Sequence, residues 1–143
     1  MMIISDISKP CLLSLPNFSD ARGQLGVVES GALPFEIKRF YYLFDVPLGA
    51  QRGEHGHKQL QQVMICLHGS CTVTLNDSKS TTEYKLTSPD VGLYVARGLW
   101  RSLSFDAPGT VVGVLASRPF ETDDYLYTFE DFLAWKQLQN PVK

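Results

Sequence analysis

What this sequence lacks first is a strong charge of either sign. Its 143 residues carry 13 lysines and arginines against 15 aspartates and glutamates, a formal net charge of −2 at pH 7. A balanced chain produces no long-range field that would hold a nucleic acid or an anionic membrane surface. We therefore expect no nucleic-acid partner, and an anionic ligand would have to be held by a few arginines gathered in one place.

Segments for membrane insertion or secretion are missing as well. No apolar run approaches the roughly 20 residues that a membrane-spanning helix needs. Residues 1–6 form neither a basic region nor an apolar stretch of signal length. The three cysteines, Cys11, Cys66 and Cys71, cannot all pair with one another and follow no metal-ligand spacing. These features predict no membrane partner and a cytoplasmic location with reduced thiols.

The chain also lacks a linker, a charge run and an internal repeat, which predicts one domain over residues 1–143. Turn-forming residues punctuate it about every ten positions, and Cys71-Thr72-Val73-Thr74-Leu75 alternates apolar and polar side chains as a half-buried strand does. Many short strands at this spacing favour an all-β sandwich or barrel. The expected strands are 25–29, 37–44, 62–67, 71–75, 82–86, 92–95, 101–105 and 110–115.

The C-terminal stretch has a different pattern. Acidic residues at 121–124 are typical of a helix start, and Leu126, Phe129, Phe132 and Leu133 follow at helical spacing. This predicts one short C-terminal helix, from the acidic segment to about Lys136, packed on the sheet or on a partner.

Histidine is scarce, and two of the three histidines lie two residues apart in the run RGEHGHK at 52–58. On a strand, side chains two apart point to the same face, so His55 and His57 should lie side by side. Two imidazoles on one face are consistent with a metal site or with acid–base catalysis. Zn²⁺ and Fe²⁺ take three or four protein ligands.

The metal alternative fits poorly. His-x-His on a barrel strand matches the first half of the cupin metal motif, but Gln61 and Gln62 stand where a glutamate ligand is expected. The later histidine ligand is absent, because the corresponding segment holds Trp100 and Arg101. Acid–base catalysis needs a neutral imidazole with an oriented partner. The sequence offers tyrosine and arginine partners for that role: Tyr41, Tyr42, Tyr94, Arg22, Arg39, Arg52, Arg97 and Arg101.

Several blocks together resemble a known family. They are PFEIKRFYYLFD at 34–45, RGEHGHK at 52–58, LQQVMICLHGS at 60–70, SPDVGLYV at 88–95 with the following Gly98-Leu99-Trp100, and VLAS at 114–117. The chain from about residue 13 to 133 is similar to the nucleotide-sugar 3,4-ketoisomerases, the WxcM-like cupins that act on dTDP-4-keto-6-deoxyglucose. In that family a histidine often follows the Gly-x-Trp, where this chain has Arg101.

The resemblance implies a fold and an assembly. The fold is a cupin jelly-roll barrel with a short C-terminal helix. The assembly is a homodimer that exchanges N-terminal strands, and residues 1–15, which carry several apolar side chains, are candidates for the exchanged segment.

The resemblance also implies an activity: moving the keto group of a dTDP-linked keto-deoxy sugar from carbon 4 to carbon 3, for deoxyamino-sugar biosynthesis, with no metal and no cofactor. His55 would be the catalytic base, with His57 beside it and Tyr41 as a partner in proton handling. The expected substrate-binding residues are Arg22, Arg39, Arg52, Tyr94, Trp100 and Arg101.

Three alternatives stay open at this point. A related cupin could be a dTDP-sugar 3,5-epimerase, which exchanges the proton of a different carbon. A non-catalytic cupin could bind a nucleotide sugar as a sensor, and a metal dioxygenase would require the missing ligands.

Overall fold

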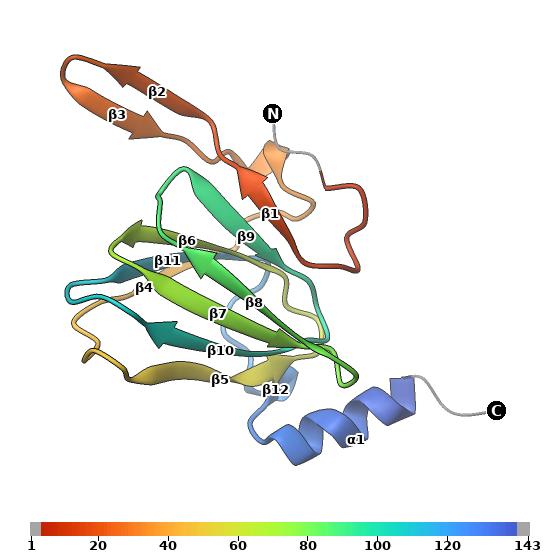
Figure 1. Ribbon diagram of the computed structural model, residues 1–143. Coiled ribbons are helices and arrows are strands. Elements are labelled where there is room, and N and C mark those ends of the chain that lie inside the picture. Colours follow the sequence, from red (N-terminus) through yellow and green to blue (C-terminus); the bar gives the residue numbers. More distant parts are fainter. Residues whose placement is uncertain (1–3, 140–143) are drawn as a thin grey trace.

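The computed structural model describes residues 4–139. Two antiparallel five-stranded sheets face one another and form a barrel-like sandwich, with strand orders β1-β9-β6-β11-β4 and β12-β5-β10-β7-β8 (Figure 1). A separate two-stranded hairpin, β2-β3, extends away from the barrel, and a C-terminal helix lies at one end (Figure 1). The predicted all-β fold with one short C-terminal helix is confirmed.

The strands and helices have these bounds: β1 Cys11–Ser14, β2 Asn17–Asp20, β3 Gly23–Gly26, η1 Ser30–Ala32, β4 Arg39–Leu43, β5 Gln51–His57, β6 Gln62–His68, β7 Cys71–Asn76, β8 Thr81–Leu86, β9 Val91–Val95, β10 Trp100–Phe105, β11 Val111–Ala116, η2 Thr122–Asp124, β12 Tyr125–Leu126 and α1 Phe129–Gln139.

The core lies between the two sheets and is apolar over most of its length. Strand β7 shows why, because its buried positions, Cys71, Val73 and Leu75, alternate with partly exposed ones, as the sequence predicted. Strand β6 is buried at five consecutive positions, since its outer side is partly covered as well. Among residues 4–139, this core fills the space between the sheets, and a polar cavity opens at one end of the barrel.

The β2–β3 hairpin is an arm with no core of its own. Every residue of both strands is exposed, and its two apolar side chains, Phe18 and Leu25, are direct cross-strand partners that are 64% and 62% exposed. The sequence predicted a strand at 25–29, but β3 ends at Gly26, and the four-residue strands β1 and β2 were not among the expected strands.

The predicted start of the C-terminal helix is wrong. Residues 122–124 form the short 3₁₀ turn η2, Leu126 lies in the two-residue strand β12, and α1 begins only at Phe129. Thr128 caps α1, because its hydroxyl accepts the backbone N–H of Asp131 at 3.0 Å. The acids that suggested a helix start serve another purpose: the Asp124 carboxylate accepts the N–H groups of Gln59 and Leu60, at 2.7 and 3.2 Å.

Among residues 4–139, α1 is the only α-helix, and no helix there has the length and apolar character to cross a membrane.

Candidate active site

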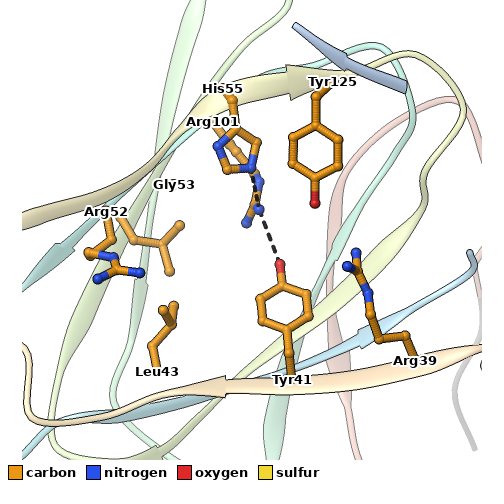
Figure 2. A pocket seen from close by; sticks show the side chains of 9 residues that line it. Arg39, Tyr41, Leu43, Arg52, Gly53, His55, Arg101 and Tyr125 are labelled. Carbon is orange, nitrogen blue, oxygen red and sulfur yellow. Dashed lines mark hydrogen bonds between the residues drawn. The ribbon is translucent and has the colours of Figure 1, made fainter. Parts of the chain in front are cut away.

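A cavity of about 200 Å³ opens between the two sheets at one end of the barrel (Figure 2). Four strands and nine residues line it: Arg39, Tyr41 and Leu43 of β4, Arg52, Gly53 and His55 of β5, Arg101 and Leu103 of β10, and Tyr125 of β12. Five of the residues predicted for the site, His55, Tyr41, Arg39, Arg52 and Arg101, therefore meet in one place.

His55 and Arg101 are held together by strand pairing. They lie directly opposite one another on β5 and β10, and Arg101 Nη2 is 3.0 Å from His55 Nε2. A guanidinium only donates hydrogen bonds, so Nε2 accepts and the ring proton of a neutral His55 resides on Nδ1. In this structure the lone pair of the imidazole is therefore covered by Arg101.

The environment of His55 strongly favours its neutral form. Burial, and secondly the nearby charge of Arg101, lower the pKa of His55 from 6.5 to about 4. At neutral pH the imidazole is therefore free of a proton on Nε2, which is the state that a general base requires.

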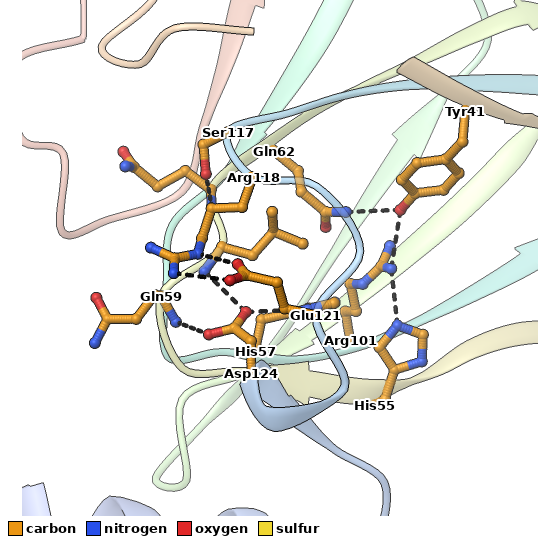
Figure 3. A network of polar contacts seen from close by, with 12 residues as sticks. Tyr41, His55, His57, Gln59, Gln62, Arg101, Ser117, Arg118, Glu121 and Asp124 are labelled. Atoms are coloured by element: carbon orange, nitrogen blue, oxygen red, sulfur yellow. Dashed lines mark hydrogen bonds and ion pairs between the residues drawn. The ribbon is translucent and has the colours of Figure 1, made fainter. Parts of the chain in front are cut away.

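Tyr41 is positioned by two hydrogen-bond donors. Arg101 Nη2 donates to the Tyr41 hydroxyl at 3.1 Å, and Gln62 Nε2 donates to it at 2.6 Å (Figure 3). Both lone pairs of the phenolic oxygen are then occupied. Its own hydrogen is left to donate toward the cavity that Tyr41 lines, so the hydroxyl is arranged as a donor to a ligand.

His57 lies behind His55 rather than in the cavity. Its ring is 4.8 Å from the ring of His55, and only 3% of the residue is exposed. Within residues 4–139, neither ring nitrogen has a hydrogen-bond partner. Burial first, then the charges of Arg101, His55 and Arg39, lower the pKa of His57 to about 2.

Asp124 is the acidic side chain next to His57. The His57 Nδ1 to Asp124 Oδ2 distance of 3.9 Å is too long for a hydrogen bond. Because the imidazole is neutral, the two groups do not form an ion pair either. His57 thus packs behind the base and supplies no contact to the cavity.

A β-bulge in β5 turns two neighbouring residues toward the cavity. Arg101 pairs with His55, but Leu103 pairs with Arg52, so β5 has one residue more than β10 over this stretch. Gly53 takes the bulge conformation with φ +66°, and a Cβ there would lie 3.2 Å from Leu103 Cδ1. As a result Arg52 and Gly53, although adjacent, both line the cavity.

The cavity carries positive charge. Three of the nine lining residues are arginines and none is acidic. Arg39 Nε and Nη2 are buried and have no hydrogen-bond partner among the described residues, and the guanidinium lies 5.0 Å from the centre of the Tyr41 ring. An unpaired buried guanidinium is costly unless an anion joins it, so the site is built to receive a negatively charged ligand.

Three predicted ligands lie outside this cavity. Tyr94 is fully buried, and its hydroxyl donates to the carbonyl of Ile7 at 2.7 Å and lies 2.8 Å from Gln61 Oε1, so it is a core residue and no stacking platform. Trp100 packs on Phe129 and Phe132 of α1, at ring distances of 5.6 and 6.0 Å.

Arg22, the third, lies at the turn of the β2–β3 arm. It pairs with Asp20 at 2.7 Å, and 91% of its side chain is exposed. Within a single chain, therefore, Arg22 is separate from the site.

Tyr125 and Gln62 were missed as site residues. Tyr125 lay in the segment that was expected to be helical, and Gln62 was considered only as a metal ligand. An alternating Tyr125-Leu126-Tyr127 pattern after a turn was the available signal for a strand. Within residues 4–139, no group of three or more histidine, cysteine, aspartate or glutamate side chains is arranged to hold a metal ion.

Comparison with known proteins gives consistent results. A family model described as FdtA, WxcM-like, C-terminal, matches residues 8–137. A TDP-4-oxo-6-deoxy-α-D-glucose-3,4-oxoisomerase from Aneurinibacillus thermoaerophilus is 39% identical over 122 residues, which is 85% of this chain and 88% of that protein.

Two solved structures are also similar. The sugar 3,4-ketoisomerase QdtA from Thermoanaerobacterium thermosaccharolyticum, in complex with TDP, has a TM-score of 0.88 and 32% identity, covering 92% of this chain and 96% of that one. The TDP-quinovose 3,4-ketoisomerase WlaRB from Campylobacter jejuni has a TM-score of 0.83 and 39% identity, covering 87% and 97%.

Proposed function

Since the chain belongs to the FdtA-type WxcM-like family, we propose that it is a TDP-sugar 3,4-ketoisomerase that moves the oxo group of TDP-4-oxo-6-deoxyglucose from carbon 4 to carbon 3. The observation that supports this most is a neutral imidazole, His55, joined to a guanidinium and a tyrosine hydroxyl in a cavity without acidic side chains. A base beside two hydrogen-bond donors is what enolisation of a ketone requires.

The first step is removal of the proton on carbon 3, which the neighbouring carbonyl makes acidic. His55 Nε2 takes this proton and becomes an imidazolium, while the electron pair of the C–H bond forms the C3=C4 bond and the negative charge appears on O4. When the carbonyl oxygen binds, the Arg101 guanidinium turns from Nε2 to O4. The lone pair of His55 is thereby uncovered, and the oxyanion gains a cationic donor.

Tyr41 assists the same step. Its hydroxyl is already oriented by Arg101 and Gln62, so it donates to the enediolate with little reorganisation. The imidazolium then returns a proton to carbon 4 while the hydroxyl proton of O3 is transferred to O4, and the 3-oxo, 4-hydroxy sugar is formed.

The remaining arginines are suited to the diphosphate. A volume of about 200 Å³ is smaller than the roughly 300 Å³ of pockets for drug-sized ligands, so the cavity takes the sugar and leaves the nucleotide at its mouth. Arg39 and Arg52 line the cavity on β4 and β5 and offer planar donors to phosphate oxygens.

The test is a proton NMR time course of TDP-4-oxo-6-deoxyglucose with the protein in D₂O, with a chelator present. Signals of a 3-oxo isomer, deuterated at carbon 4, are the expected result. Exchange at carbon 5 would support the 3,5-epimerase alternative, and binding of TDP without any conversion would support the non-catalytic alternative. Activity that needs added Fe²⁺ or Zn²⁺ would overturn the metal-free mechanism.

We also propose that the protein is a homodimer in which the N-terminal arms cross between copies. An isolated two-stranded hairpin is marginally stable in water, yet the β2–β3 arm exposes Phe18 and Leu25. The outer face of the edge strand β4 carries a second exposed apolar row. Its members, Phe40 and Tyr42 of β4 and Phe44 directly after the strand, are 51–58% exposed, and successive rings are 5.7 and 5.8 Å apart.

Two unpartnered apolar surfaces on one chain are what a second copy would cover. Arg22 would contact substrate only if the arm of one copy reached the cavity of the other copy. Sedimentation should give twice the monomer mass of 16.0 kDa, and a monomer at micromolar concentration would overturn the proposal. Deletion of residues 1–9 should weaken the dimer before it alters catalysis.

A further inference from the structure

Tyr125 brings a second tyrosine hydroxyl into the cavity, from an element far from Tyr41 in the sequence. It belongs to β12, whose register places it directly opposite His57 on β5. Its ring lies 4.5 Å from the ring of His57 and 5.0 Å from that of His55, and Phe120 supports it at 5.0 Å from another side. Figure 2 shows its hydroxyl pointing into the cavity from the side opposite Leu43.

The two hydroxyls differ in the hydrogen bonds still open to them. The Tyr41 oxygen already accepts from Gln62 and Arg101, so it has a hydrogen to donate but no free lone pair. Among residues 4–139, the Tyr125 hydroxyl makes no hydrogen bond with another side chain that lines the cavity. A phenolic oxygen without partners can accept from one group of a ligand while it donates to another.

The isomerisation needs such a group. Converting a 4-oxo, 3-hydroxy sugar into a 3-oxo, 4-hydroxy sugar moves two protons, one from carbon 3 to carbon 4 and one from O3 to O4. His55 can take the proton from carbon 3 and deliver it to carbon 4. The oxygen-bound proton requires a second carrier that is both acceptor and donor, and neither the cationic Arg101 nor the doubly occupied Tyr41 has a lone pair for it.

We propose that the Tyr125 hydroxyl carries the proton from O3 to O4, a role that rests on the proposed ketoisomerase function. As the imidazolium gives its proton to carbon 4, the O3–H bond breaks toward Tyr125 Oη and the C3=O3 bond forms. The hydrogen of the Tyr125 hydroxyl passes to O4 and becomes the new 4-hydroxyl. His55 and Tyr125 both end in their starting protonation states, so the step needs no further reactant.

The test is Tyr125→Phe, which removes the hydroxyl and keeps the ring that supports the two histidines. In D₂O, two rates are measured on TDP-4-oxo-6-deoxyglucose: formation of the 3-oxo isomer, and loss of the carbon-3 proton from unconverted substrate. In the wild type the two should proceed together. In Tyr125→Phe, isomer formation should fall on the order of 10²-fold, while carbon-3 exchange and TDP binding stay within about threefold.

Tyr127→Phe is the matched control, because Tyr127 is a neighbouring tyrosine, 58% exposed, that does not line the cavity. It should leave both rates unchanged. If carbon-3 exchange and isomer formation fall together in Tyr125→Phe, the proton relay is wrong and Tyr125 only supports the histidines. Isomer formation at the wild-type rate in this variant would also overturn the relay. A wild-type protein that neither isomerises nor exchanges would instead refute the ketoisomerase function.

Discussion

Two guanidinium groups, one in the cavity and one on the arm, show how differently the two regions are constructed. Arg101 is 3% exposed and contacts His55 and Tyr41, which come from two other strands. Within the part of the chain that the structure describes, the Arg22 side chain forms hydrogen bonds only with Asp20, two residues away, on a hairpin whose every strand residue is exposed. In the cavity the fold of one chain supplies all the partners. On the arm, the described part of the chain supplies only a local partner, so the role of the arm depends on a second molecule.

The largest effect should come from the cavity. His55→Asn removes the base and keeps a polar side chain, so turnover should fall on the order of 10²- to 10⁴-fold. TDP binding should persist, because Arg39 and Arg52 are untouched. Steady-state kinetics and calorimetric titration with TDP measure the two effects. Turnover within about threefold of wild type would exclude His55 as the base.

The arm should show the opposite behaviour, a loss of assembly with an intact barrel. Phe18→Ser combined with Leu25→Ser removes the apolar pair, and burying one such side chain contributes about 1.5–3 kcal/mol. The loss of both side chains, about 3–6 kcal/mol, should therefore raise the dissociation constant of the dimer by at least about 10²-fold, as measured by sedimentation.

Leu138→Ser is the control, because Leu138 is 77% exposed on α1, away from the arm. If the arm variant and the control sediment identically, the arm is not part of an interface.

A smaller effect is expected from Tyr41→Phe. It removes one donor to the enediolate and leaves the packing of the ring in place, at a cost of about 1–1.5 kcal/mol, or roughly 5- to 13-fold in kcat. The measurement is kcat at saturating substrate, beside His55→Asn. A larger loss in Tyr41→Phe than in His55→Asn would reverse the roles assigned to the two residues.

The smallest effect concerns the pKa of His55. Arg101→Gln removes the positive charge and keeps an N–H donor, so protonation of the imidazole becomes easier and its pKa rises. Burial contributes more than Arg101 to lowering the pKa to about 4, so the rise should cover less than half the distance back to 6.5. An NMR titration of the ring protons measures it in the free protein, and an unchanged or lower pKa would contradict the argument.

The sequence predicted most of the fold because strand periodicity and turn residues are local signals. Five of the nine lining residues were also expected, and that expectation came mainly from the resemblance to a known family. Strand pairing then places His55 opposite Arg101. Tyr94 and Trp100, which were expected to bind substrate, do not line this cavity, and the sequence could not show this because aromatic side chains occur both in cores and in ligand sites. The register of β9 places Tyr94 in the core, and the docking of α1 places Phe129 against Trp100. Both are tertiary features that the local sequence does not show.

The C-terminal error has a tertiary cause. A run of acids normally favours a helix N-terminus, but here the Asp124 carboxylate satisfies the backbone of the segment between β5 and β6. This fixes η2 against the barrel, allows β12 to pair with β5, and delivers Tyr125 to the cavity. No local pattern contains that information, because the partners are more than sixty residues apart.

The bulge at Gly53 has a consequence for how this site can change by mutation. Arg52 lies opposite Leu103, and His55 opposite Arg101, because β5 has one residue more than β10 over this stretch. Deleting Gly53 would remove that extra residue and leave both pairs in register, so the Arg52 guanidinium would stay on the cavity side. Replacing Gly53 would instead place a side chain 3.2 Å from Leu103 Cδ1 on a backbone with φ +66°, which disturbs the wall of the cavity.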